Sequence, residues 1–200
     1  MGTSEPRRMR ADARDNRERV LRAARDAFTE DGPHASLNKI AQRAGVGAGT
    51  LYRHFPTLDA LVVAIIGADV EALCAYGREL LSHPSPDEAL RGWLRAVAVH
   101  ATAMRGLVAT RMAAPPADST LAACHDAILA TGTALLARAR REGTAPEETG
   151  IADLLKLANA IAWVSEQSPE DEHLLDRLLT LAGAGLSSPP GPGRSWRGRS

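Results

Sequence analysis

The sequence has few aromatic residues, few cysteines and no net charge. Aromatic side chains make up 4% of the 200 residues, so a hydrophobic core must consist chiefly of Leu, Ala and Val. The alternating runs of β-branched, aromatic and polar residues that are typical of strands are absent. Since Ala and Leu favour helices, the composition predicts an all-α fold.

The two cysteines, Cys74 and Cys124, stand far apart and form no metal-ligand spacing. We interpret both as buried, reduced thiols of a cytosolic protein, and we expect no cofactor and no metal. No uninterrupted apolar stretch approaches the roughly 20 residues of a membrane span. The N-terminus is polar and rich in Arg, unlike a signal peptide, so we predict a cytoplasmic protein without a membrane partner.

The charges are unevenly distributed along the chain. Residues 1–60 hold eleven Lys and Arg against eight Asp and Glu, whereas the remaining residues are acidic by the same margin. A basic end and an acidic remainder are expected of a protein that meets phosphates at one end only. The excess is small and gives weak support by itself.

Helical periodicity and chain-breaking residues divide the sequence into several predicted helices. The first is predicted from about Asn16 to Asp31, where Gly32 and Pro33 end it. The others are predicted at about 36–44, 47–55, 58–81, 87–104, 107–113, 119–141, 147–167 and 169–184. The predicted organisation is a flexible basic arm at 1–14, a helix-turn-helix domain at 15–57, a larger helical domain at 58–186 and a disordered tail at 187–200.

The segment 36–55, SLNKIAQRAGVGAGTLYRHF, has the most specific pattern in the chain. Leu37, Ile40, Ala41 and Ala44 share one helical face, and Leu51 and Phe55 repeat that spacing after a glycine turn. Two short helices joined in this way form a helix-turn-helix, whose second helix can enter the DNA major groove. The pattern therefore predicts DNA binding.

The strings RVLRAARDAFTEDG, IAQRAGV and GTLYRHFPTLDAL, within residues 16–66, resemble the TetR family of bacterial transcriptional regulators. The resemblance implies a homodimer that binds a palindromic operator in double-stranded DNA. It also implies a C-terminal domain for ligand binding and dimerisation, and repression that a small-molecule effector relieves. Residues 82–200 carry no recognisable motif.

The predicted DNA-binding residues lie at the start of the second helix and on the exposed face of the third. Tyr52 is predicted to pack on DNA sugar and to donate its hydroxyl to phosphate, because a solvent-facing Tyr has no role in the core. His54 matches a family position that usually contacts phosphate. Asn38 matches a position that reaches a base in some members of the family. The full predicted set is Ser36, Asn38, Ala48, Gly49, Thr50, Tyr52, Arg53 and His54.

Three positions depart from the family pattern. Gly47 stands where a capping Ser is common, Ala48 where Lys or another polar residue is common, and Leu58 where a Lys often binds phosphate. Fewer cations weaken phosphate binding, most of all at low salt. Because Ala48 and Gly49 can offer bases only apolar or backbone contacts, the sequence predicts no operator.

The remaining predictions concern the C-terminal domain. A mostly apolar ligand pocket with few polar groups is predicted among Trp93, Val97, His100, Met104, Met112, Cys124, His125, Ile128 and Trp163. Two closing helices form broad apolar stripes, and a four-helix dimer interface is predicted at Leu154, Leu157, Ala158, Ile161, Leu174, Leu175 and Leu178. The alternative for each of these residues is the core of its own chain.

Two functions remain open at the level of sequence. The leading hypothesis is a sequence-specific DNA-binding transcriptional regulator, a repressor released by a small-molecule ligand. The alternative is a helical small-molecule-binding protein or enzyme with a vestigial DNA-binding end. No metalloprotease motif, phosphate loop, nucleophile elbow or catalytic carboxylate pair is present, so we predict that the chain is not an enzyme.

Overall fold

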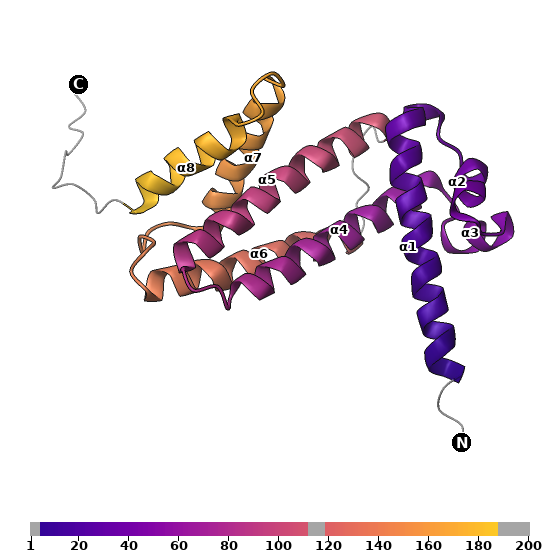
Figure 1. Cartoon of the computed structure of the whole chain (residues 1–200), viewed down its shortest axis with the longest axis horizontal. Coiled ribbons are helices and arrows are strands. Elements are labelled where there is room, and N and C mark those ends of the chain that lie inside the picture. Colours follow the sequence, from indigo (N-terminus) through magenta and orange to yellow (C-terminus); the bar gives the residue numbers. More distant parts are fainter. Residues whose placement is uncertain (1–4, 112–118, 188–200) are drawn as a thin grey trace. The chain divides into compact units, whose positions relative to one another are not determined.

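The computed structural model describes residues 5–111 and 119–187, and in these ranges it contains helices and no strand. The all-α prediction is therefore confirmed. The elements are α1 (Glu5–Asp31), the 3₁₀ turn η1 (Gly32–His34), α2 (Leu37–Ala44), α3 (Ala48–His54), α4 (Leu58–Leu80), α5 (Pro86–Arg111), α6 (Ser119–Arg141), α7 (Ile151–Glu166) and α8 (Leu174–Ser187), as labelled in Figure 1.

The chain divides into two compact units. The N-terminal unit comprises the described parts of Met1–Asp69 and Ala103–Ala123, and the C-terminal unit those of Val70–Thr102 and Cys124–Ser200. The helices α4, α5 and α6 each contribute to both units. The N-terminal unit extends past the predicted boundary at residue 57, since the first half of α4 belongs to it and Asp69 pairs with Arg25 of α1.

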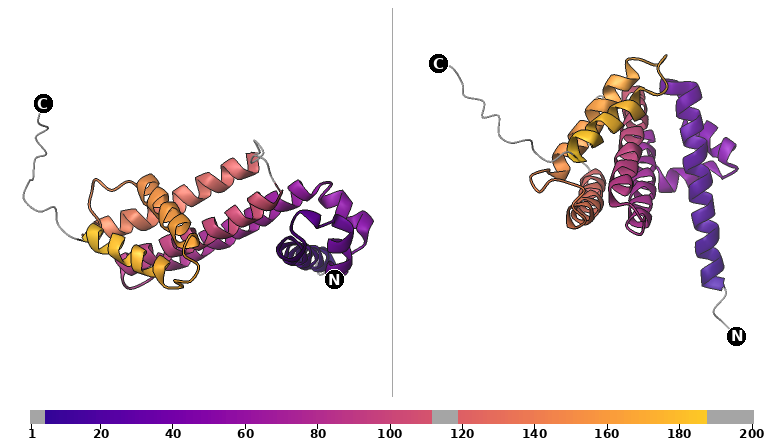
Figure 2. Two further views of the ribbon diagram at one scale, coloured as in Figure 1. Left: turned by 90° about the horizontal axis from the view of Figure 1, so that it is seen from above. Right: turned by 60° about the vertical axis from the view of Figure 1, so that its left-hand side comes forward.

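The core of the N-terminal unit follows the predicted stripes. The apolar residues of α1, α2 and α3 that share a helical face are buried: Val20, Leu21, Ala24, Ala27, Phe28, Leu37, Ile40, Ala41, Ala44, Leu51 and Phe55. In Figure 2, α2 packs against α1, and α3 packs against α2. Burial of this set stabilises the three-helix unit, because each large apolar side chain removed from water contributes about 1.5–3 kcal/mol.

The helix α1 begins at Glu5, eleven residues before the predicted start at Asn16. The flexible arm predicted for residues 1–14 is thus helical from Glu5 onward, and that part of the prediction is wrong. Pro6 is tolerated in a first turn, and Ala and Arg, which follow it, are good helix formers. Of the tail predicted at 187–200, Ser187 is the last residue of α8, and residues 188–200 lie outside the described residues.

The helix α5 runs unbroken from Pro86 to Arg111, where the sequence predicted two helices interrupted near residue 105. Gly106 does not end the helix, because a single helical Gly costs only about 1 kcal/mol. Conversely, α7 and α8 begin later than predicted, at Ile151 and Leu174. The intervening loops are therefore longer than the sequence indicated.

The core of the C-terminal unit is built around Trp93 of α5, which is fully buried. Its indole Nε1–H donates to the carbonyl oxygen of Leu73 on α4 at 3.3 Å. Two glycines, Gly77 on α4 and Gly132 on α6, lie against the indole ring. A Cβ at Gly132 would stand 2.7 Å from Trp93 Cζ3, so only glycine allows this packing of α4, α5 and α6.

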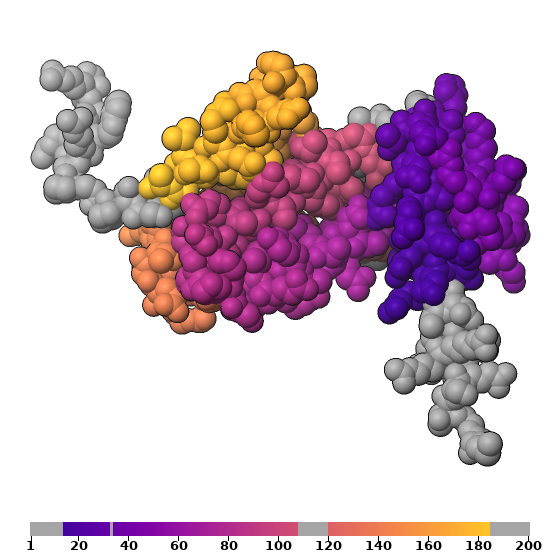
Figure 3. Space-filling model, in the orientation of Figure 1, coloured from indigo at the N-terminus to yellow at the C-terminus, as the bar shows by residue number. Residues whose placement is uncertain are grey.

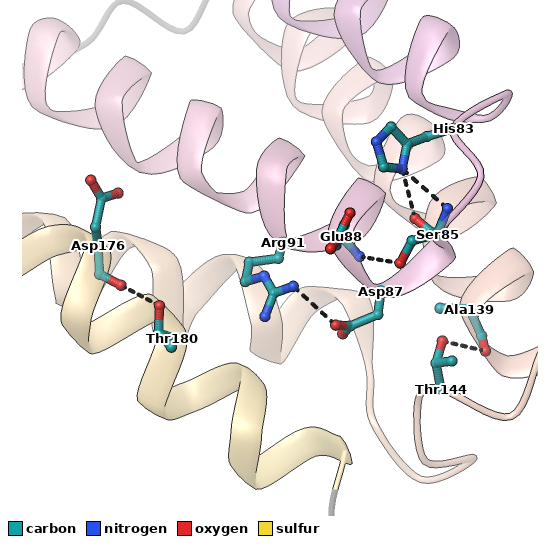
Figure 4. A network of polar contacts seen from close by, with 9 residues as sticks. All are labelled: His83, Ser85, Asp87, Glu88, Arg91, Ala139, Thr144, Asp176 and Thr180. Atoms are coloured by element: carbon teal, nitrogen blue, oxygen red, sulfur yellow. Dashed lines mark hydrogen bonds and ion pairs between the residues drawn. The ribbon is translucent and has the colours of Figure 1, made fainter.

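The turn between α4 and α5 is fixed by side-chain hydrogen bonds (Figure 4). The N–H of Ser85 donates to His83 Nδ1 at 3.2 Å, and Ser85 Oγ accepts from the N–H of Glu88 at 3.3 Å, which caps α5. From α6, Arg138 donates to the carbonyl oxygen of Leu80 at 3.2 Å and to that of His83. These bonds satisfy carbonyl groups at the end of α4.

An ion pair ties α5 to α8. Arg95 donates through Nη2 to Asp176 Oδ2 at 3.1 Å and also bonds Oδ1 through Nε. The hydrogen bond from Arg95 lowers the pKa of the Asp176 carboxyl.

The helix α6 is long and apolar enough over residues 120–141 to meet the length and composition of a membrane span. Its inward face nevertheless packs into the core through Leu135, Leu136 and Ala139, and Arg138 binds carbonyls of the α4–α5 turn. We interpret it as a helix whose larger part, from Cys124 onward, packs against other helices of the C-terminal unit.

Candidate nucleic-acid interface

The turn between α2 and α3 is set by glycine. Gly45 has a φ of 66°, in the left-handed region that costs other residues strain, and its N–H donates to the carbonyl oxygen of Gln42 at 3.2 Å. The N–H of Val46 donates to the carbonyl oxygen of Ala41 at 3.0 Å, which completes a helix-ending motif. Gly47 then opens α3 without a capping side chain, as predicted.

Ser36 is the N-cap of α2. Its Oγ accepts from the N–H of Lys39 at 3.3 Å, and its backbone is extended. The hydroxyl proton takes no part in that bond, so Ser36 keeps a donor that can reach a phosphate.

The helix α3 presents one buried and one exposed face. Leu51 and Phe55 are buried, as predicted, whereas Tyr52 is 44% exposed. The other predicted contact residues of α3 are exposed as well: Ala48, Gly49, Thr50, Arg53 and His54. Space is open where a Cβ would stand at Gly49, so DNA can approach the backbone closely there.

The side chain of Arg53 forms hydrogen bonds within its own helix, α3. Its Nε–H donates to the carbonyl oxygen of Gly49 at 3.2 Å, and its Nη2 reaches Thr50 Oγ1 at 3.4 Å. These are weak, exposed bonds that DNA phosphate or a guanine edge can replace. Arg53 must therefore reorient if it contacts DNA.

The two basic residues of α2 form ion pairs with the last two residues of α1, which are acidic. Lys39 Nζ lies 3.6 Å from Asp31 Oδ2, and Arg43 Nη2 lies 2.6 Å from Glu30 Oε2. The hydrogen bond to Glu30 raises the pKa of Arg43. Both cations therefore pair within the chain, and neither stands among the predicted DNA-binding residues.

Sequence reasoning missed Arg17 of α1. The continuous helix brings Arg14 and Arg17 to the same hollow as Thr50 and His54 of α3. Among the residues whose side chains are described, Arg17 has no ion pair, whereas Arg14 lies 3.6 Å from Glu18. Arg14 and Arg17 lie about one helical turn apart, at i and i+3. This spacing was the pattern in the sequence that could have indicated a shared basic face. Leu58, at the family's cationic position, is half-buried instead.

The predicted ligand-pocket residues are scattered over several environments. Trp93 and Val97 are buried in the helical core, and Cys124, Ile128, His100 and Met104 are half-buried, so Cys124 is less enclosed than predicted. Burial raises the pKa of the Cys124 thiol. His125 is exposed, and Met112 lies outside the described residues.

Trp163 does not fit an interior pocket. Its side chain is 54% exposed, because it lies on the face of α7 opposite to the buried residues Leu154, Leu155 and Ala158. Its assignment to the ligand pocket stays a prediction, and in the single chain it lies on the exposed apolar surface of α7.

The predicted dimer residues also separate into two groups. Leu154, Ala158 and Ile161 are buried within their own chain, so the alternative of intrachain core holds for them. Leu157 is 42% exposed, and Leu174, Leu175 and Leu178 are half-buried. A cavity of about 30 Å³ lies among α5, α7 and α8, beside Leu157 and Leu179.

Two family models match the chain and together cover most of it. Residues 20–65 match the model described as bacterial regulatory proteins, tetR family. Residues 85–188 match the C-terminal domain of SbtR-like transcriptional regulators. A curated relative, an HTH-type transcriptional regulator of Staphylococcus aureus, is 37% identical over 73 residues, which span 36% of this chain and 40% of the relative.

Solved structures resemble the chain over nearly their whole length. A TetR transcriptional regulator from Streptomyces coelicolor is 34% identical with a TM-score of 0.70, over 88% of this chain and 99% of that one. A TetR transcription regulatory protein from Mycobacterium vanbaalenii is 38% identical with a TM-score of 0.69, over 90% and 99% of the two chains.

Proposed function

The chain belongs to the TetR family of bacterial transcriptional regulators, and we propose that it is a homodimeric repressor that a small-molecule ligand releases from its operator. The observation that carries the DNA-binding part is the exposed face of α3 on an intact helix-turn-helix scaffold. Leu51 and Phe55 fix the helix, and Tyr52 stands out from it. Such a helix enters the major groove of DNA.

The contacts divide into those that position the protein and those that read bases. Ser36, Thr50, Tyr52 and His54 carry hydroxyl or imidazole donors suited to phosphate. Asn38 suits adenine, and Arg53 suits guanine once it leaves Gly49 and Thr50. Ala48 and Gly49 contribute apolar and backbone contacts, which give close approach but little direct readout.

The dimer interface is proposed at the exposed apolar surface of α7 and α8. Leu157, Trp163, Val164 and Leu181 are between 42% and 69% exposed there. The half-buried residues Leu174, Leu175 and Leu178 line the same helix pair. Figure 3 shows the outer surface of α8, in yellow, on the face that it draws. An apolar surface of this kind supports an isologous contact with a second copy.

Replacing Trp163 by Asp is expected to convert the dimer into a monomer, because a carboxylate buried in an apolar interface is left unpaired. Sedimentation equilibrium of the full chain measures this. The matched control is Val99→Asp on α5, which is 47% exposed and lies outside the α7–α8 pair. A Trp163→Asp variant that stays dimeric would place the interface elsewhere.

The effector site is proposed in the C-terminal unit near His100, Cys124 and Ile128, half-buried side chains of α5 and α6. Because α4 contributes to both units, a ligand that shifts α4 would change the separation of the two recognition helices. Half-sites lie about 34–36 Å apart per helical turn, so a small change breaks the match.

The similar proteins are regulators, and this supports a role in transcription rather than in catalysis. The S. aureus relatives match over less than half of their length, so the partners and the effector are proposals for this chain. Members of the family are soluble and cytoplasmic in general, and we propose the same location here.

A further inference from the structure

A hollow of about 540 Å³ lies between α1 and α3 in the N-terminal unit. Its walls are apolar side chains from α1, from α3 and from the residues that flank α3: Val20, Val46, Leu51 and Phe55. Its remaining lining residues are polar or basic: Arg14, Asn16, Arg17, Thr50 and His54. The hollow therefore combines an apolar interior with polar groups, as small-molecule sites do.

The charged side chains that line the hollow are all basic. None of its described lining residues is acidic, whereas Arg14, Arg17 and His54 supply N–H donors. Arg14 lies 3.6 Å from Glu18, a pair whose side chains are 76% and 60% exposed, so this attraction is weak. Arg17 has no ion pair among the residues whose side chains are described. An anion is the complementary partner.

The volume favours a small organic molecule over DNA phosphate alone. Ligand pockets commonly measure about 300–1,000 Å³. A phosphodiester needs donors at a surface but no apolar volume, and Val20, Leu51 and Phe55 offer no group to bind it. A molecule with an aromatic or aliphatic body and one acidic group uses both parts of the hollow.

We propose that this hollow binds a small organic anion whose apolar body packs on Val20, Val46 and Phe55 and whose acidic group meets Arg17 and His54. Thr50 and His54 also belong to the proposed DNA surface, so the bound anion competes with DNA. That second step rests on the proposed function. The result is a ligand site inside the DNA-binding unit, separate from the effector site proposed in the C-terminal unit.

The test is a fluorescence titration of the full chain with 1-anilinonaphthalene-8-sulfonate, an aromatic sulfonate of suitable size. Arg17→Leu is expected to weaken binding about tenfold, since a charge-assisted hydrogen bond is lost. Arg22→Leu, on the same helix but outside the lining, should retain the native affinity. The uncharged analogue N-phenyl-1-naphthylamine should bind both arginine variants alike.

A second variant tests the apolar part of the site. Val46→Phe fills the hollow and is expected to weaken both probes, with helicity unchanged by circular dichroism. Equal sulfonate affinity in the native chain, Arg17→Leu and Val46→Phe would overturn the proposal. The titration contains no DNA, so its result is independent of whether the chain is a repressor. Displacement of the probe by operator duplex then tests the competition, and its absence would overturn that step.

Discussion

Replacing Tyr52 by alanine is expected to weaken binding to an operator duplex by about tenfold to a hundredfold. Tyr52 is 44% exposed on α3, while its neighbour Leu51 is buried. The substitution removes a ring that packs on sugar and a hydroxyl that donates to phosphate, and it leaves the core intact. Fluorescence anisotropy with a labelled duplex measures the change.

Two variants separate contact from folding in this experiment. Tyr52→Phe keeps the ring and should lose only the part of the affinity that the hydroxyl provides. Tyr76→Ala removes a tyrosine of similar exposure, 41%, from α4 in the C-terminal unit, and it should bind DNA as the native chain does. Native affinity in Tyr52→Ala would show that α3 does not meet DNA with this face.

Replacing Gly77 by alanine is expected to destabilise the chain by about 1–3 kcal/mol, because it overpacks the core. A Cβ at Gly77 would stand 2.8 Å from Trp93 Nε1 and would also meet the Thr131 methyl group. The indole cannot move away, since it is fully buried and its Nε1–H is bonded to Leu73. Urea denaturation at one fixed protein concentration measures the loss.

Gly67 is the matched control, because it lies in the same helix, α4, and has nothing within 4 Å of the position of a Cβ. Gly67→Ala should raise the free energy of unfolding by up to about 1 kcal/mol through helix propensity. The two substitutions are thus expected to have opposite signs. A stabilising Gly77→Ala would contradict the packing described for Trp93.

The helix-turn-helix could be predicted from the sequence in detail. Its signals are local: an N-cap at Ser36, a left-handed glycine at Gly45 and apolar residues at helical spacing. Each signal acts within one or two turns of helix, so no knowledge of distant contacts was needed. The burial of Leu51 and Phe55 and the exposure of Tyr52 follow from the same spacing.

The start of α1 and the role of Arg17 could not be predicted in the same way. Residues 5–14 are as polar as a solvated tail, and only their helix propensity, without an apolar stripe, supports the helix. The hollow beside Arg17 depends on how α2 and α3 are placed relative to α1, which residue spacing does not determine.

The surface of α7 was harder to predict, because the helix is apolar on more than one face. Leu154, Ala158 and Ile161 turn into their own chain, whereas Leu157, Trp163 and Val164 turn outward. Both sets are compatible with helical periodicity, so the rotation of α7 about its axis decides which of them can meet a second copy. That rotation is set by the packing of the C-terminal unit.

The most direct test of DNA recognition by α3 in a dimer is selection from a pool of random duplexes with the purified full chain. We expect enrichment of an inverted repeat whose half-site centres are separated by one helical turn, about 34–36 Å, or a multiple of it. The Tyr52→Ala variant should enrich the same sequence less strongly. A pool that stays random through successive rounds, or one that yields a single unrepeated site, would contradict the account.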